Sequence, residues 1–174
     1  MGFSGSGFVR ALEGEGATMT SRPEIRHADA RRVAGLALRT DNAAESGAAR
    51  KIPGLWQRYR NEDWFAQLER FGAFGPPLGV YSAYESDRNG SFQILAGREV
   101  PPSAKVTAPL HVAAIPAGKY LVFKSTGPLP GSVIKGWQQV WAHFERPDAG
   151  ARAYTCDFEV YPNDHTVEIW VAVL

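Results

Sequence analysis

The spacing of apolar and polar positions predicts helices and strands in a set order. Ile52, Leu55 and Tyr59 recur at the spacing of one helix face. Pro53 falls in the first turn of this helix, where proline is tolerated. For the first half of the chain, the expected elements are a strand at 31–39, a helix at 52–59, a second helical piece near 64–68, and strands at 79–84 and 91–100.

The second half of the chain repeats this order. Its expected elements are a strand at 111–125, a helix at 132–144, and strands at 154–161 and 166–174. YSAYESD at 81–87 aligns with FEVYPND at 158–164, and FQILAG at 92–97 aligns with VEIWVA at 167–172. An internal duplication of this kind changes the whole fold prediction. We therefore expect an α+β fold of tandem duplicated strand-helix-strand-strand units, with an antiparallel sheet and a pseudo-twofold groove.

Composition divides the chain into a leader and one domain. Residues 1–22 are rich in Gly, Ser and Thr and lack periodicity, which predicts a flexible leader. Residues 23–174 form the single predicted domain, with repeat one at about 23–100 and repeat two at about 105–174. The leader is too short for a helix-turn-helix module, so we expect no direct binding of nucleic acid.

The last predicted hairpin pairs an aliphatic face with an acidic and aromatic one. Strict alternation is typical of strands that pack one side on a core. In the first of its strands the polar face carries Asp157, Glu159 and Tyr161. In the second strand we expect the same face to include Glu168 and Trp170. The aliphatic face should lie under the helices.

A turn at 162–165 would place Glu159 directly opposite Glu168. The same register sets Tyr161 against Thr166 and Asp157 against Trp170. Two carboxylates in this position repel each other. The pair persists if it is solvated, if one group takes a proton or if a cation neutralises it. Open sheets also carry Glu and Tyr on a wet face for solubility alone, and the pattern by itself leaves both interpretations open.

Carboxylates beside aromatic faces suit a lipophilic cation. The acid supplies charge, and a ring face adds a cation–π attraction of about 0.5–2 kcal/mol. The predicted ligand is therefore a cationic, aromatic small molecule. The predicted ligand-binding residues are Glu168 as the charge partner, Glu159 as a second carboxylate, and Trp170, Tyr161, Tyr84 and Trp56 as aromatic walls.

Composition and charge narrow the remaining classes. The 174 residues are 44% hydrophobic and carry a net charge of +1, which is typical of a globular protein without a basic stripe. Apolar runs are far shorter than the roughly 20 residues of a membrane span. Cys156 stands alone, which excludes an internal disulfide and fits a cytoplasmic protein, and its place on the aliphatic face predicts an inert buried thiol. The histidines lack metal-ligand spacing and no cofactor or nucleophile motif is present, so we expect no metal, no cofactor and no catalytic residue.

Several segments together resemble the gyrase-inhibitor-like family. They are IPGLWQRY (Ile52–Tyr59), GVYSAYESDRNGSFQILAGREV (Gly79–Val100), IPAGKYLVF (Ile115–Phe123), CDFEVYP (Cys156–Pro162) and VEIWVAVL (Val167–Leu174). The family comprises bacterial effector-binding domains that also occur in AraC-type and MerR-type regulators. The resemblance runs from about residue 24 to 174 and keeps the order of the motifs.

The resemblance implies a groove between two units, in which multidrug-sensing members hold lipophilic cations through a buried glutamate and aromatic residues. The matching positions are Glu168 in VEIW and Glu159 in FEVY, with Trp170 in place of a frequent tyrosine and Trp56 in the IPxLW segment. Without a DNA-binding module, the chain resembles stand-alone members, including those on mobile gene cassettes. Three hypotheses follow: a small-molecule binding module, a hydrolase of electrophilic genotoxins, or an inhibitor-like partner of gyrase or of a regulator.

Overall fold

The computed structural model describes residues 18–19 and 22–174, so the expected leader lies almost wholly outside the described residues. The described helices and strands are β1 (Thr18–Met19), β2 (Glu24–Ala28), β3 (Arg31–Thr40), α1 (Asn42–Glu45), α2 (Ile52–Asn61), α3 (Trp64–Gln67), the 3-10 helix η1 (Leu68–Phe71), β4 (Phe74–Ser82), β5 (Phe92–Val100), β6 (His111–Ile115), β7 (Gly118–Thr126), α4 (Gly131–Phe144), β8 (Asp157–Asn163) and β9 (Thr166–Ala172).

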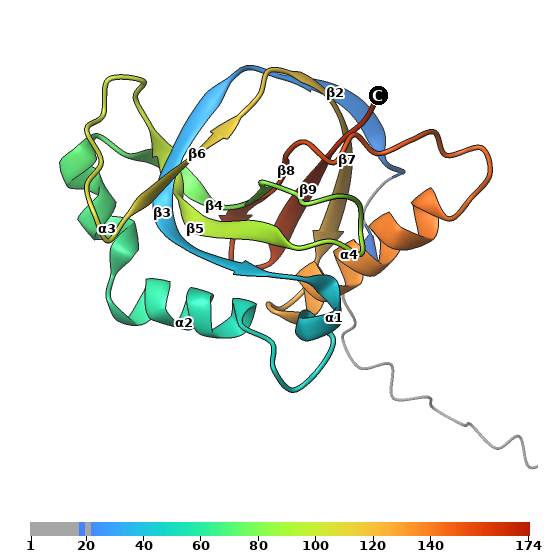
Figure 1. The fold of residues 1–174 in the computed structure, drawn as a ribbon, viewed down its shortest axis with the longest axis horizontal. Helices are drawn as coiled ribbons and strands as arrows, with labels where there is room; N and C mark the ends of the chain where they lie inside the picture. Colours follow the sequence, from blue (N-terminus) through green and yellow to red (C-terminus); the bar gives the residue numbers. More distant parts are fainter. Residues whose placement is uncertain (1–17, 20–21) are drawn as a thin grey trace, which may run out of the picture.

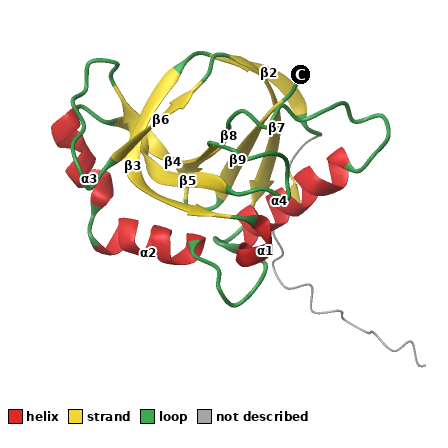
Figure 2. Ribbon diagram, viewed as in Figure 1, coloured by secondary structure: helices red, strands yellow, loops and turns green. Residues whose placement is uncertain are grey.

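The strands form one antiparallel sheet that curls into a half-barrel, with the helices outside it (Figures 1 and 2). The strand order is β1-β7-β9-β8-β4-β5-β3-β6, and β2 also pairs with β7. The expected α+β architecture is confirmed. The single strand expected at 111–125 is instead two strands, β6 and β7, because the chain turns at Pro116. The short helix α1 and the strand β2 have no counterpart in the prediction.

The predicted duplication is visible in the sheet order. Each half consists of a first strand, a covering helix and a hairpin: β3, α2, β4 and β5 in one half, and β7, α4, β8 and β9 in the other. The order β7-β9-β8-β4-β5-β3 reads the same from either end. A pseudo-twofold axis therefore passes between β4 and β8, where the two halves meet.

Strand pairing corrects one of the two repeat alignments. Ile94 and Ile169 hold the same place in the segments FQILAG and VEIWVA. Tyr81 pairs with Ile94 in one half, and Glu159 pairs with Ile169 in the other. Tyr81 is therefore the counterpart of Glu159, whereas the sequence alignment had matched Tyr81 with Phe158. The error is one residue, which moves every side chain to the other face of a strand.

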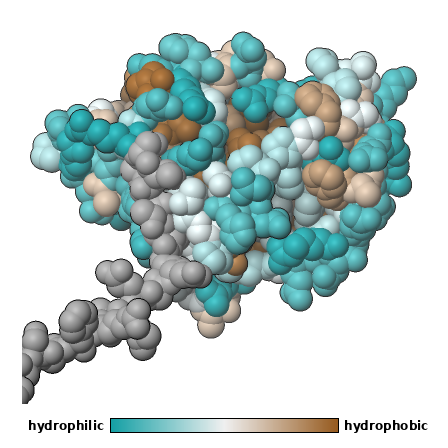
Figure 3. Space-filling model, turned by 180° about the vertical axis from the view of Figure 1, so that it is seen from behind, coloured by the Kyte–Doolittle hydropathy of each residue, from teal (hydrophilic) through white to brown (hydrophobic). Residues whose placement is uncertain are grey.

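The two faces of the sheet build separate parts of the core. The concave face holds a cluster around Tyr120, Phe158 and Trp170, which fills the inside of the half-barrel. The convex face packs under helices α2 and α4. There Val167 and Ile169 lie with Val140 of α4 in one cluster, so the expected aliphatic face of the last strand does lie under a helix. The same prediction is wrong for the strand before it, because Phe158 lies in the concave cluster, away from the helices. Seen from behind, the surface is mostly hydrophilic, with small groups of hydrophobic residues near its centre (Figure 3).

Close contact of β3 with β5 depends on two glycines that face each other. Gly35 pairs with Gly97. A Cβ at Gly97 would lie 1.9 Å from the carbonyl oxygen of Ala34, and one at Gly35 would lie 2.0 Å from that of Ala96. Neither backbone atom can move without breaking the ladder. Glycines in such places allow a sheet to bend sharply, which here permits the curvature that closes the half-barrel.

We expect Gly97→Ala to destabilise the protein by about 3 kcal/mol or more, because the added methyl group must separate two paired strands. Gly54 in helix α2 is the matched control, since a Cβ there meets nothing within 4 Å. Gly54→Ala should stabilise the protein by about 0.5–1 kcal/mol, through the higher helix propensity of alanine. Urea unfolding followed by circular dichroism measures both changes. Equal stability of the two variants would contradict this account of the curvature.

Candidate functional site

Glu159 lies on β8 beside the pseudo-twofold axis and is one of two fully buried acids on the convex face of the described sheet. It is 1% exposed. Its Oε1 accepts hydrogen bonds from the Tyr81 hydroxyl and the Trp137 indole nitrogen, both at 2.7 Å. Its Oε2 accepts from the Tyr161 hydroxyl at 2.5 Å. The donors come from β4, α4 and β8. Both halves of the duplication therefore donate hydrogen bonds to the same carboxylate.

Aromatic rings complete the enclosure. Trp56 of α2 meets Tyr161 edge to face, with ring centroids 5.2 Å apart. Tyr81 and Trp137 meet in the same way at 5.0 Å. Trp56, Trp137 and Tyr161 are half-buried, so each of these residues is partly exposed to solvent. A carboxylate surrounded by ring faces and edges has the composition of a site for an organic cation.

A glycine makes room for this acid. Gly79 of β4 pairs directly with Glu159 across the seam between the halves. A Cβ at Gly79 would lie 2.6 Å from Glu159 Oε2 and 3.2 Å from the Trp56 ring. The carboxylate therefore occupies the space that a side chain at residue 79 would fill.

Glu159 has no cationic partner among the described residues, whereas the neighbouring buried acid has one. Asp157 lies two residues earlier on the same face and is also fully buried. Its Oδ2 is 2.6 Å from Arg152 and also accepts a hydrogen bond from the Tyr84 hydroxyl. Its Oδ1 accepts a hydrogen bond from the Ala172 amide. Buried charges are normally paired. Of these two acids, only Glu159 lacks a counter-charge.

The lack of a counter-charge affects the protonation of Glu159. Burial raises the pKa of its carboxyl group, because the charged form loses water. The hydrogen bonds from Tyr161, Trp137 and Tyr81 lower the pKa and offset part of that rise. A cation beside the carboxylate would favour the charged form further. Within the described part of the chain, hydrogen bonds alone stabilise the charged form of Glu159.

Comparison with known proteins identifies the family of the chain. Residues 24–173 match the family of integron-associated effector binding proteins. The chain belongs to this family. The predicted resemblance to effector-binding domains is thereby confirmed, and membership indicates that the protein binds small molecules.

Individual relatives support the same placement of this integron-associated effector binding protein. It is 33% identical over 156 residues to "Putative transcriptional regulator protein YobU" of Bacillus subtilis strain 168, covering 86% of this chain and 96% of YobU. A crystal structure of an integron cassette protein from Vibrio cholerae is 31% identical with a TM-score of 0.77, covering 91% of this chain and 99% of that one. SAV2435 bound to tetraphenylphosphonium shares the fold, with 21% identity, a TM-score of 0.70 and coverage of 88% and 94%.

The predicted register of the last hairpin is wrong by one residue. Glu159 pairs with Ile169 and Glu168 pairs with Val160, so the two acids are not opposite each other. The register shifts between Val160 and Asn163, which a tight turn at 162–165 does not allow for. As a result, Glu159 faces the helices while Glu168 is on the concave face.

Glu168 and Trp170 have partners inside the half-barrel. The Glu168 side chain is 22% exposed and lies 3.5 Å from Arg26. The Trp170 indole nitrogen donates to Glu168 at 3.2 Å. Arg26 and Arg31 lie over the Trp170 ring, at 5.5 and 5.9 Å from its centroid. The cations beside Trp170 therefore belong to the chain itself.

The structure brings together some of the sequence-predicted residues and separates others. Glu159, Tyr161 and Trp56 form one cluster. Tyr84 is on the same side of the sheet but donates to Asp157 rather than to Glu159.

Two residues that contact Glu159 were absent from the predicted set. Trp137 belongs to the helix expected at 132–144 but was not selected as a site residue, and Tyr81 was aligned with the wrong residue of the second half. The sequence of this helix did indicate an unusual surface, because a second tryptophan, Trp141, follows Trp137 one turn later.

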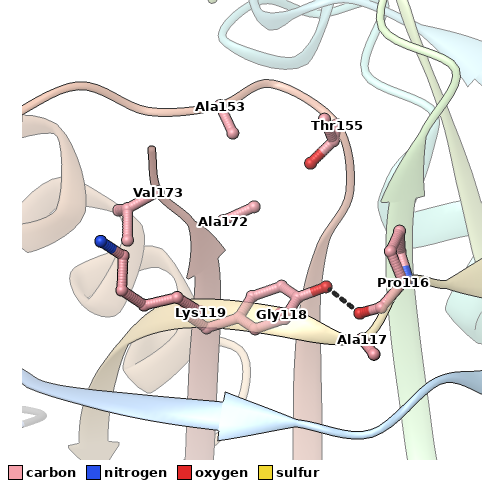
Figure 4. Close-up of a pocket in the computed structure, with 9 residues that line it drawn as sticks. Pro116, Ala117, Gly118, Lys119, Ala153, Thr155, Ala172 and Val173 are labelled. Atoms are coloured by element: carbon pink, nitrogen blue, oxygen red, sulfur yellow. Dashed lines mark hydrogen bonds between the residues drawn. The ribbon is translucent and has the colours of Figure 1, made fainter.

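Two other features of the described chain are separate from this site. Cys156 is buried as predicted, and burial raises the pKa of its thiol to about 12, so it is a poor nucleophile at neutral pH. A hollow of about 270 Å³ lies beside the turn from β6 to β7, lined by residues such as Pro116, Lys119 and Thr155 (Figure 4). Its lining is mostly small or apolar and includes no acid. No described helix has the length and apolar character needed to cross a membrane.

Substitution of the two buried acids should have opposite effects on stability. Asp157→Asn leaves Arg152 buried without its partner, and we expect a loss of about 3–5 kcal/mol. Glu159→Gln removes an unpaired charge from a site of the same shape, so the variant should be at least as stable as wild type at pH 8. The folded-state pKa of Glu159 is raised, so wild-type stability from this group is present in acid and is lost as pH rises through that pKa. The advantage of Glu159→Gln in stability should therefore vanish at about pH 4, where the Glu159 carboxyl of the wild type is protonated in both the folded and the unfolded state. Thermal unfolding from pH 4 to 8 tests this expectation, and a Glu159→Gln variant as unstable as Asp157→Asn would refute it.

Proposed function

We propose that this protein is a binding module for lipophilic, aromatic cations, and that Glu159 is the residue that binds the charge. The observation that carries the proposal is the contrast between two buried acids: Asp157 is paired with Arg152, and Glu159 has no described cation beside it. A ligand cation would supply the missing charge. SAV2435, which shares the fold, provides a suitable probe in tetraphenylphosphonium.

Binding requires rearrangement around the acid, because Glu159 is almost fully buried. Tyr81 is also buried and lies within the sheet, so its hydrogen bond should persist. Tyr161 and Trp137 are only half-buried, and their rings would turn aside to admit the ligand. Their faces would then contact the ligand rings, while the cation takes the place of the lost hydrogen bonds.

The groups around Glu159 support binding rather than hydrolysis. Its oxygen atoms contact two phenols and one indole, all of which are hydrogen-bond donors. These hydrogen bonds occupy both oxygen atoms and stabilise the charged carboxylate, so they oppose its action as a general base on water. Interaction with gyrase or with a transcriptional regulator stays a prediction.

Calorimetric titration with tetraphenylphosphonium should show binding by the wild type. Glu159→Gln should weaken the affinity by about 30-fold or more, because a buried charge pair loses one partner. Glu168→Gln is the matched control, since Glu168 already pairs with Arg26 on the other face, and its affinity should equal that of wild type. Equal binding by wild type and Glu159→Gln would refute the proposal.

Affinity should also depend on pH in a direction set by Glu159. Protons compete with the cation for the carboxylate, and burial raises the pKa at which they do so. Affinity should therefore rise with pH through the raised pKa and level off above it. Tetraphenylphosphonium has a fixed charge, so any pH dependence comes from the protein. Titrations at several pH values measure the slope, and an affinity that improves in acid would contradict this assignment.

A further inference from the structure

The hollow beside the turn from β6 to β7 has walls whose backbone is held by hydrogen bonds. On one side, the Tyr120 hydroxyl donates to the carbonyl oxygen of Pro116 at 2.7 Å and fixes the turn (Figure 4). On the other side, the Ala153 amide donates to the carbonyl oxygen of Ala172 at 2.8 Å. Ala172 itself belongs to β9 and forms part of the lining. The hollow of about 270 Å³ is therefore already formed by the fold, as small-molecule sites usually are.

The charge in the described lining of this hollow is positive. Lys119 supplies it, and none of the ion pairs between described residues includes Lys119. His27, which is also basic, pairs directly with Lys119 across β2 and β7. From the facing wall, Thr155 turns its hydroxyl towards the hollow (Figure 4). A lysine ammonium carries donors only and a hydroxyl can donate as well, so both groups suit an anion.

The wall that carries Thr155 contains a strained residue. Tyr154 has a φ of 51°, in the left-handed region that a bulky side chain rarely adopts. Arg152 holds it in place, because the guanidinium carbon lies 4.4 Å from the centre of the Tyr154 ring and the guanidinium is paired with Asp157. Backbone of this kind is costly, and it is concentrated at ligand-binding and active sites. The strain therefore supports a role for this wall beyond packing.

The rest of the lining is small and mostly apolar. It includes the side chains of Pro116, Ala153, Ala172 and Val173. Pockets for drug-sized ligands have volumes of about 300–1,000 Å³, so a hollow of about 270 Å³ admits only a compact molecule. A ligand that matches this lining is thus small, apolar over most of its surface and negative at one end.

We infer that this hollow is a second binding site, and that its ligand is a compact apolar monocarboxylate. The carboxylate lies between the Lys119 ammonium and the Thr155 hydroxyl, while the apolar body of the ligand lies against Ala153 and Ala172. None of the side chains that donate hydrogen bonds to Glu159 belongs to the described lining of the hollow. The inference therefore does not rest on the proposed function, and the two sites select molecules of opposite charge.

Benzoate is a suitable probe, and benzamide is its neutral counterpart of nearly the same shape. Titration of ¹⁵N-labelled protein with benzoate, followed by NMR, should give saturating shifts at the amides of Gly118, Lys119, Ala153 and Thr155. Because the charge partner is an exposed lysine, we expect a Kd on the order of 1 mM. Benzamide should bind at least about threefold more weakly. Shifts that do not saturate, that appear only elsewhere or that are equal for the two probes would overturn the inference.

Variants of the lining test the two polar contacts and the apolar space separately. Lys119→Met removes the ammonium but keeps the aliphatic stem, so it should weaken benzoate by about three- to fivefold and leave benzamide unchanged. Thr155→Val keeps the shape without the hydroxyl and should weaken benzoate by a similar factor. Ala153→Leu fills the hollow and should abolish binding of both probes. Lys124→Met is the matched control for Lys119→Met, because Lys124 is exposed on the same strand but outside the hollow, and its affinity for benzoate should equal that of wild type.

These variants distinguish a built site from a general attraction of benzoate to basic residues. If Lys119→Met and Lys124→Met behave alike, or if Ala153→Leu still binds benzoate, the site is refuted. If only the variants of the hollow lose affinity, the site stands. Glu159→Gln should bind benzoate as wild type does, whatever its effect on tetraphenylphosphonium. Lys119 and Thr155 are exposed, so their variants should be as stable as wild type, which thermal unfolding checks.

Discussion

The site is organised around a buried carboxylate that has hydrogen-bond donors but no counter-charge. Removal of a carboxylate from water is costly, and hydrogen bonds recover only part of that cost. Three donors, which come from β4, α4 and β8, must therefore stay in place around Glu159. Their positions require α4 to lie over the seam, β4 to pair with β8, and residue 79 to have no side chain. The central contact between the halves thus follows from the needs of one functional group.

The chain handles positive charge beside aromatic rings in two ways. On the concave face, Arg31 lies over the stacked pair of Phe158 and Trp170, so the cation is part of the fold. On the convex face, the rings around Glu159 lack such a resident cation among the described residues. The first arrangement stabilises the half-barrel from inside. The second leaves an attraction unsatisfied, which is the basis of the proposed cation binding.

The sequence predicts much of the fold because periodicity reports which side of an element is buried. The helices, most of the strands and the duplication follow from that periodicity, and the faces of the last strand are right for Val167 and Ile169. The site is harder, because the relation between two strands depends on their register. One shift between Val160 and Asn163 sends Glu159 and Glu168 to opposite faces. No alternation within either strand reports that shift, and the choice between the two acids therefore needed the structure.

The counterpart of Glu159 across the pseudo-twofold axis is Tyr81, and the Tyr81 hydroxyl donates a hydrogen bond to Glu159. If the halves were identical, two glutamates would meet at this place with no water between them. Their repulsion would oppose closure of the sheet, and one would have to take up a proton. A duplicated gene avoids this repulsion when one of its two copies carries another residue at this position. A phenol is a suitable replacement, because it turns a repelling neighbour into a donor. The difference between the halves at residues 81 and 159 thus gives a pseudo-symmetric sheet one carboxylate at this place instead of two.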